Sequence, residues 1–340
     1  MATTEFNQGE PGHTGTDRPA IGRDGGELVN EANMGATEGT GPALEEGDTA
    51  FKRLSRGQIF RRRFLRNRSA VLGLVGFLLM VLFALLGPHI GHYKYTDSDF
   101  LNFHVPPNAD HWLGTTKDGS DVFAMLVEGL RKSLVIGLCV SGIQTVVAAA
   151  MGSAAAYFGG WFDKCALWVI DLLLVVPSFL LIAIISQSMG AASKGSIPMF
   201  IILLAAFGWM LSARVIRSMT LSVRNMEYVT AAKYMGVPAP TIIARHILPN
   251  ISSYIIIDAT LGVASAVLSE TTLSYFGFGV KPPKTSLGTL IAQSQGDIAV
   301  YPWTFVYPAL ILIVMLVCIN LVGDGVRDAL DSSSKSGGQA

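Results

Sequence analysis

Three carboxylates lie inside apolar stretches of the sequence, where an ionisable side chain is costly and usually has a function: Asp171, Asp258 and Glu270. Asp171 stands six residues before Pro177, in the run VIDLLLVVP. Pro177 is expected to kink its segment and to free a backbone carbonyl. Asp258 either faces a polar cavity or pairs with a base on a neighbouring subunit, and both interpretations stay open. Glu270 is interpreted as structural.

Four histidines fall in one polar segment and invite a metal site: His89, His92, His104 and His111. Their spacing is irregular, so ordinary surface histidines are the favoured interpretation. The sequence has neither the GxxxxGK[ST] loop of ATP-binding proteins nor the GxSxG and HExxH motifs of hydrolases. We therefore expect no catalytic residue, no cofactor and no metal ion on this chain.

The composition requires several membrane spans. Of the 340 residues, 50% are hydrophobic and only 15% are charged, which excludes a soluble globular domain. Six apolar runs are long enough, or nearly so, to cross about 30 Å of hydrocarbon as helices. They are Ala70–Leu86, Leu134–Phe158, Ala166–Ser186, Ile197–Ala213, Ile251–Ser269 and Phe305–Val322. The sequence therefore predicts an all-α polytopic membrane protein with six transmembrane helices.

The basic residues orient these predicted helices. Residues 51–68 carry eight Lys and Arg residues and no acid, directly before the first run, and such segments stay on the cytoplasmic side. With six spans and a cytoplasmic N-terminus, 18 of the 25 Lys and Arg residues lie on the cytoplasmic side. This arrangement puts both termini and the 214–250 loop in the cytoplasm.

The two segments before the first run differ sharply in charge. Residues 1–50 hold ten acids and two bases, with Phe6 as their only aromatic residue, so we expect a disordered acidic cytoplasmic tail. Residues 51–69 form a basic juxtamembrane segment that is expected to contact membrane lipid. With Phe60 and Phe64 interleaved, it can lie on the membrane surface as an amphipathic helix. Its place beside a membrane span argues against nucleic-acid binding.

The loop between the fourth and fifth runs has the pattern of a helix–turn–helix. Glu227, Ala231 and Ala232 stand at helical spacing and put a carboxylate beside small side chains. Gly236 ends this helix, and Pro240 opens a second one. A membrane protein gains little from so ordered a loop unless another protein docks on it. The alternative is an ordinary cytoplasmic loop that happens to be helical.

The run EYVTAAKYMG at 227–236, followed by ILPN at 247–250, resembles the EAA loop of ABC-importer permeases. Its form is typical of the dipeptide/oligopeptide, or C-type, permease family. The resemblance implies a type I ABC-importer permease fold, in which the loop at 224–250 forms a cytoplasmic coupling helix that docks on an ATPase subunit. It assigns the coupling contacts to Arg224, Glu227, Tyr228, Ala231, Ala232, Lys233 and Gly236.

Further matches extend the resemblance from about residue 58 to residue 331. HWLGT at 111–115, SETTLSYFG at 269–277 and the closing NLVGDGVRDALD at 320–331 follow the family's pattern. The implied domains, after the tail and the basic segment, are a first transmembrane helix with an extracytoplasmic loop at 70–132, a permease core at 133–326 and a cytoplasmic C-terminal tail at 327–340.

The resemblance implies a multi-pass permease subunit in a bacterial cell membrane that imports di- or oligopeptides, with nickel or glutathione as alternative cargoes. Its implied partners are a homologous permease in a heterodimer, two ABC ATPase subunits that hold the ATP and Mg, and an extracytoplasmic substrate-binding protein. In that assembly Asp171, Pro177 and Asp258 are candidates for the translocation pathway, where Asp258 would meet a peptide's ammonium end.

Two other classes of membrane protein compete with this prediction. An ion-coupled secondary transporter would use Asp171 and Asp258 for proton coupling. It predicts charge partners within the spans, which the sequence does not indicate, and it leaves the loop at 224–250 unexplained. A non-transporting membrane receptor would leave the acids within the spans unexplained.

Overall fold

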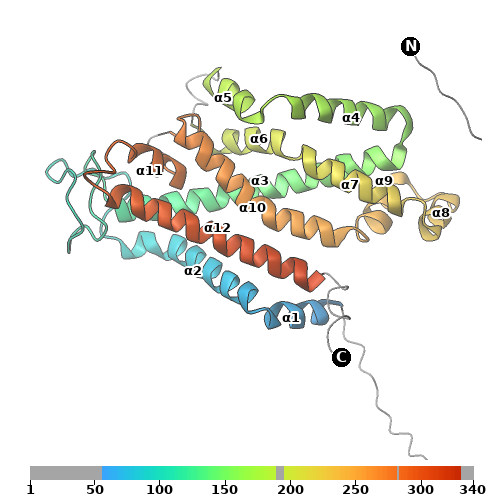
Figure 1. Ribbon diagram of the computed structural model, residues 1–340, viewed down its shortest axis with the longest axis horizontal. Coiled ribbons are helices and arrows are strands. Elements are labelled where there is room, and N and C mark those ends of the chain that lie inside the picture. Colours follow the sequence, from blue (N-terminus) through green and yellow to red (C-terminus); the bar gives the residue numbers. More distant parts are fainter. Residues whose placement is uncertain (1–55, 189–194, 282, 331–340) are drawn as a thin grey trace, which may run out of the picture. The chain divides into compact units, whose positions relative to one another are not determined.

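The structure, a computed structural model, describes residues 56–188, 195–281 and 283–330. The regular elements of these residues are all helical (Figure 1). The predicted acidic tail at 1–50 lies outside the described residues, as do the first part of the basic segment and the C-terminal tail from Asp331 onward. The elements are α1 (Arg56–Arg66), α2 (Arg68–Ile90), α3 (Val122–Phe158), α4 (Gly160–Val175), α5 (Ser178–Ser188), α6 (Ile197–Gly208), α7 (Met210–Val223), α8 (Glu227–Tyr234), α9 (Ala239–Ile242), the π-helical turn η1 (Ile243–Ile247), α10 (Ser252–Tyr275), α11 (Leu287–Gln293) and α12 (Trp303–Leu330).

Four helices are long and apolar enough to cross a membrane: α2, α3, α10 and α12. Two bent pairs pass the same test together, α4 with α5 across an 80° bend and α6 with α7 across a 45° bend. By length and composition the described chain thus has four to six candidate spans. Each of the six predicted runs falls on one of these helices or bent pairs.

The first bend lies at Pro177, between α4 and α5. Proline lacks the N–H that would continue the helical hydrogen bonds, and its ring collides with the preceding turn. A new helix begins directly, because the N–H groups of Leu180 and Leu181 both donate to the Pro177 carbonyl. The predicted kink is therefore present, and it turns the chain by 80°.

The second bend lies at Trp209, between α6 and α7. The Gln144 side chain of α3 reaches this bend, where its Nε2 donates a 3.0 Å hydrogen bond to the Leu204 carbonyl. A Cβ at Gly208 would collide with the Gln144 amide. The bend thus depends on a glycine that admits the α3 side chain and on an amide that donates to the backbone of α6.

Helix α3 is central, since it contacts α2, α6, α7, α10 and α11. It begins at Val122, twelve residues before the predicted start of the span at Leu134. The early start follows from the Asp121 cap, whose Oδ1 accepts a 2.8 Å hydrogen bond from the first turn. Close packing against α7 requires a glycine, because a Cβ at Gly152 would lie 2.5 Å from the Ala213 carbonyl.

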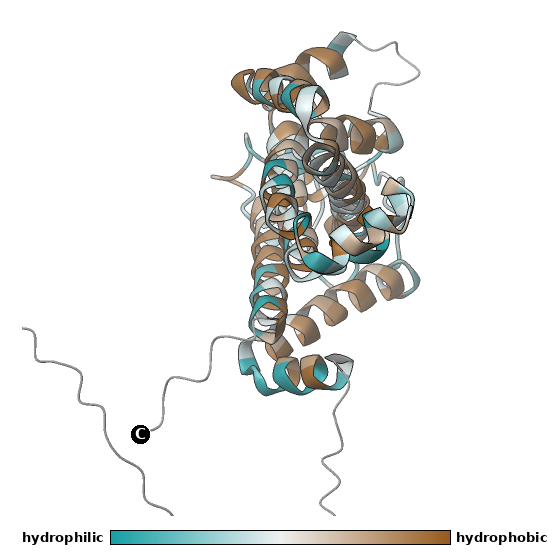
Figure 2. Ribbon diagram, turned by 90° about the vertical axis from the view of Figure 1, so that its right-hand side faces the viewer, coloured by the Kyte–Doolittle hydropathy of each residue, from teal (hydrophilic) through white to brown (hydrophobic). Residues whose placement is uncertain are grey.

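Helix α1 is fixed to the ends of α2 and α12. Phe64 is buried in a cluster with Ala70 of α2 and Val326 of α12. Asn67 caps α2, and its Nδ2 donates a 2.8 Å hydrogen bond to Asp328 of α12. Figure 2 shows hydrophilic residues on α1 and mainly hydrophobic ones along the long helices. The described part of the basic segment thus forms the predicted helix, whose apolar Phe64 packs on α2 and α12. Its position on the membrane surface stays a prediction.

Glu270 of α10 is fully buried and joins three helices. It accepts hydrogen bonds from Ser133 of α3 at 3.2 Å and from Ser274, one turn along α10, at 2.7 Å. The Ser133 hydroxyl in turn accepts a hydrogen bond from the N–H of Leu287 at the start of α11. This network agrees with the structural interpretation of Glu270.

We expect Ser133→Ala to destabilise the folded protein. The substitution removes a hydrogen bond from the buried Glu270 and takes the acceptor away from the Leu287 N–H, a loss of about 1–3 kcal/mol. Thermal unfolding of the purified protein in detergent measures the effect. Ser253→Ala changes an exposed serine of α10 and serves as the control. Equal melting temperatures for the two variants would contradict the role of this network.

Candidate functional site

The loop between α7 and α10 folds as a compact unit of residues 227–250, called here the hairpin. Gly236 adopts φ = +75° after α8, a left-handed conformation that favours glycine. Pro240 lies in the first turn of α9, where the N–H that proline lacks has no helical acceptor. Figure 1 shows α8 and α9 beyond the end of α7, at the opposite end of the helices from α11. The predicted helix–turn–helix is confirmed.

Buried apolar side chains fix the hairpin to the helices behind it. Val229 and Ala232 of α8 share a buried cluster with Ile242 and Ile247 of the second arm and with Ile216 of α7. Full burial of an isoleucine side chain contributes about 1.5–3 kcal/mol. The second arm also contacts α3 through η1. The inner face of the hairpin is therefore held firmly against α3 and α7.

Polar contacts strengthen this attachment where α7 enters the hairpin. Arg224 Nη1 donates a 2.5 Å hydrogen bond to the Ala156 carbonyl near the end of α3. Cations are favoured at helix C-termini, where carbonyls lack helical donors. Asn250 Nδ2 donates to the Tyr228 hydroxyl between the two arms. The Arg224 guanidinium thus binds the end of α3, and its predicted contact with a partner stays a prediction.

The outer side of α8 is open to the surroundings. Of the residues predicted to make coupling contacts, the exposed ones are Glu227, Tyr228, Ala231, Lys233 and Gly236. Ala232 is only 1% exposed, because it faces the cluster beneath α8. The prediction that Ala232 forms part of a contact surface is therefore corrected: it packs the helix from below.

Two large side chains of this surface were missed in the sequence. Tyr234 is 88% exposed and Met235 is 74% exposed, directly before Gly236. Aromatic residues and methionine are enriched in contacts between proteins. Helical spacing indicates the exposure of Tyr234, which is neither three nor four residues from Val229 or Ala232. Met235 follows the last residue of α8, so helical spacing gives no signal for it. Together with Glu227, they give α8 an outer surface that combines apolar area with a carboxylate.

Two ion pairs join α4 to α7. Asp163 accepts two hydrogen bonds from Arg217, at 2.5 and 2.6 Å, in the bidentate geometry typical of strong Arg–carboxylate pairs. Further along α4, Asp171 contacts Arg214. Asp171 therefore has a charge partner within the candidate spans, which corrects the expectation that such partners are missing.

Asp258 of α10 has hydroxyl partners. Its Oδ1 accepts hydrogen bonds from Ser212 of α7 at 2.9 Å and from Tyr254, one turn earlier on α10, at 3.3 Å. The residue is half-buried. The predicted alternatives, a substrate ammonium group or a base on a neighbouring subunit, both stay predictions.

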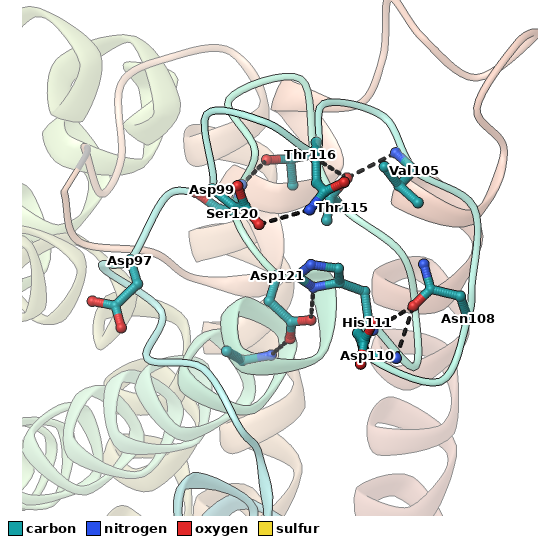
Figure 3. A network of polar contacts seen from close by, with 12 residues as sticks. Asp97, Asp99, Val105, Asn108, Asp110, His111, Thr115, Thr116, Ser120 and Asp121 are labelled. Atoms are coloured by element: carbon teal, nitrogen blue, oxygen red, sulfur yellow. Dashed lines mark hydrogen bonds and ion pairs between the residues drawn. The ribbon is translucent and has the colours of Figure 1, made fainter.

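The polar segment between α2 and α3 is organised by a hydrogen-bond network (Figure 3). His111 is 2% exposed and shares a 2.9 Å hydrogen bond with Asp121, the residue that caps α3. His111 is thus a buried positioning residue, which corrects its interpretation as a surface histidine.

Hydrogen bonds from the Leu101 N–H and the Asn102 amide lower the pKa of Asp99 below its usual value. No group of three or more potential metal ligands occurs in the described ranges.

A cavity of about 370 Å³ opens between α3, α5, α6 and α10. It borders both bends, since Ser178 directly follows the first and Gly208 directly precedes the second. Helix α10 contributes hydroxyl groups to its wall, and its lining residues carry no charge. Asp171 and Asp258, the predicted pathway acids, are not among these residues.

Comparisons with known proteins identify the family. Residues 144–336 match the family described as "Binding-protein-dependent transport system inner membrane component". The chain belongs to this family. Residues 55–107 also match "N-terminal TM domain of oligopeptide transport permease C". This range contains α1, α2 and the first part of the segment between α2 and α3.

Individual relatives place the chain more finely within the family. It is 49% identical over 282 residues to the oligopeptide transport system permease protein OppC of Mycobacterium tuberculosis, covering 83% of this chain and 96% of that relative. It is 34% identical over 269 residues to OppC of Bacillus subtilis, covering 79% and 87%. It is 30% identical over 309 residues to OppC of Haemophilus influenzae, covering 90% and 97%.

These similarities confirm the resemblance that the sequence suggested. The chain belongs with the OppC-type permeases and is a multi-pass component of an inner-membrane ABC transport system. The prediction of a transport component rather than an enzyme is confirmed by the same family membership.

Reversing one charge of the Asp163–Arg217 pair is expected to lower the yield of folded protein. Asp163→Arg places two cations together between α4 and α7 and removes both hydrogen bonds of a part-buried pair, a loss of roughly 1–3 kcal/mol. The double variant Asp163→Arg/Arg217→Asp restores opposite charges and should recover the yield, measured as monodisperse protein after size-exclusion chromatography. Lys164→Glu changes an exposed neighbour and serves as the control. A double variant no better than Asp163→Arg would contradict the pairing.

Proposed function

We propose that this chain is the permease subunit of an oligopeptide importer in a bacterial cell membrane. The proposal rests on the OppC relatives, whose names specify oligopeptide transport. Counting each bent pair as one span gives six spans, and the distribution of basic residues then favours cytoplasmic termini. The proposed partners are a homologous permease, two ABC ATPases that carry ATP and Mg, and an extracytoplasmic substrate-binding protein.

The observation that carries the proposal is the hairpin, which is packed on its inner side and exposed on its outer side. Its buried face is shared with α3 and α7, while Glu227 and Tyr234 of α8 and Met235, directly after it, are exposed. Because α8 follows α7 and η1 leads toward α10, a movement imposed on the hairpin passes directly to both helices. In this proposal the hairpin is the cytoplasmic coupling helix of a type I importer, and the ATPase docks on α8.

Exposed charge within the candidate spans supports a second permease. The side chains of Asp171 and Arg214 are 56% and 41% exposed in this chain. Charge facing hydrocarbon is costly, so this side of α4 and α7 requires cover from protein or from water in a pathway. A homologous permease supplies the cover in our proposal, which keeps Asp171 and Pro177 close to the translocation pathway.

Tyr234→Ala is expected to weaken attachment of the ATPase. Loss of an aromatic anchor from a protein interface costs about 2 kcal/mol, or roughly 30-fold in affinity. Glu227→Arg is expected to weaken attachment as well, because it reverses the charge at the start of α8. Affinity of the purified permease pair for its ATPases, and ATP-driven peptide uptake by the full complex in proteoliposomes, measure both effects.

Two controls make this test specific. Tyr234→Phe keeps the ring and should retain attachment. Phe100→Ala removes another largely exposed ring, 76% exposed in the segment between α2 and α3, and should not change ATPase affinity. Full attachment and uptake in both Glu227→Arg and Tyr234→Ala would contradict docking on α8. Uptake of nickel or glutathione instead of peptides would reassign the cargo, and proton-driven flux without ATPases would overturn the importer.

A further inference from the structure

The cavity between α3, α5, α6 and α10 is bordered by two interruptions of the helical backbone. Ser178 and Phe179 line it just after the first bend, and Phe207 and Gly208 line it just before the second. Inside a membrane, interrupted backbone is tolerated only where protein buries it or where it lines a water-filled space. The meeting of both bends at one cavity therefore favours a water-accessible site.

The first bend leaves hydrogen-bond donors at this cavity. Among the described residues, the N–H groups of Ser178 and Phe179 donate to no backbone carbonyl, whereas those of Leu180 and Leu181 donate to Pro177. The first N–H groups of a helix lack helical partners and are satisfied by side chains, water or ligands. The α5 wall of the cavity thus offers backbone donors.

The α10 wall of the same cavity carries hydroxyl groups. Ser265, Ser269 and Thr272 follow one another at helical spacing, and all three are exposed and line the cavity. Ser269 and Thr272 each donate a 2.8 Å hydrogen bond to a carbonyl one turn back. Their oxygens retain lone pairs that accept further hydrogen bonds. The α10 wall thus offers acceptors.

The remaining lining is uncharged. It combines the Gln144 amide with apolar side chains such as Phe179, Ile182 and Leu268. The volume of about 370 Å³ lies within the range of about 300–1,000 Å³ that is usual for small-molecule sites. Every peptide bond presents one N–H donor and one C=O acceptor, whatever its side chain. Donors on one wall and acceptors on another match this repeating feature.

We propose that this cavity is the subunit's share of a peptide-binding site, in which the α10 hydroxyls accept hydrogen bonds from peptide N–H groups and the start of α5 donates to peptide carbonyls. The proposal rests on the proposed function as an oligopeptide importer and names the site within it. Because the lining is uncharged, the site recognises the peptide backbone and does not select side chains by charge. It places peptide contact away from Asp171 and Asp258.

A matched pair of threonines tests the proposal. Thr272 and Thr260 both lie on α10, and each donates a 2.8 Å hydrogen bond to the carbonyl four residues earlier. Only Thr272 lines the cavity between α3, α5, α6 and α10, whereas Thr260 lies in a separate hollow beside Phe77 and Ile319. Substitution of either by valine keeps the shape and removes the hydroxyl, so the two variants differ only in which surface loses it.

The variants are compared in the full complex in proteoliposomes, with uptake of a neutral tripeptide delivered by the binding protein below saturation. Thr272→Val should lower uptake about fivefold, the factor expected for one hydrogen bond, and Thr272→Val/Ser269→Ala should lower it further. Thr260→Val should take up peptide at the wild-type rate. Equal uptake by Thr272→Val and Thr260→Val overturns the proposal. Co-purification with the ATPases confirms that each variant has assembled.

A second measurement asks for a response that a structural role alone would not give. Ser269→Asp places a carboxylate in the cavity, so uptake of lysine-containing tripeptides should rise relative to glutamate-containing ones by about tenfold or more, the factor for one charge-assisted hydrogen bond. Ser253→Asp, on an exposed position of the same helix outside the cavity, should leave the ratio unchanged. An unchanged ratio in Ser269→Asp overturns the site. Wild-type complex without ATP-driven peptide uptake instead overturns the proposed function.

Discussion

A backbone N–H or C=O without a partner is more costly inside a membrane than in water, because hydrocarbon offers no replacement. This constraint explains why the candidate spans are helices and why each interruption has a local solution. At the first bend, the Pro177 carbonyl accepts from two N–H groups of the new helix. At the second, the Gln144 amide donates to the Leu204 carbonyl, and Gly208 leaves room for it. We therefore expect a functional site where a bend leaves N–H groups without a backbone acceptor, as at Ser178.

Helix α3 contacts α2, α7, α10 and α12 and also the hairpin, through η1. It packs against α7 closely enough to require Gly152, and its last turn accepts a hydrogen bond from Arg224 at the entrance to the hairpin. The hairpin shares a buried cluster with α7 and contacts α3 through η1. A hairpin packed in this way moves with the helices behind it, because close-packed interiors transmit displacement. A force on Tyr234 therefore reaches the bundle without first deforming the loop.

The sequence was sufficient for features that depend on local chemistry. Gly236 and Pro240 set the turn of the hairpin, and Pro177 set the bend between α4 and α5. Features that depend on neighbours were missed. Helical spacing placed Ala232 beside other small residues, but only the helices beneath α8 determine that it is buried. Arg214 pairs with Asp171 across 43 positions, a contact that no local pattern indicates.

Charge in this chain is used mainly to hold helices together, which fits the uncharged lining of the cavity proposed for the peptide. The Asp163–Arg217 pair and the Asp171–Arg214 pair both tie α4 to α7, and Asp258 joins α10 to α7 through Ser212. A fixed charge in this cavity would favour peptides of the opposite charge over peptides of the same charge. Transport requires binding weak enough to leave. Hydroxyl and backbone contacts, each contributing about 1 kcal/mol, meet that requirement for peptides of either charge.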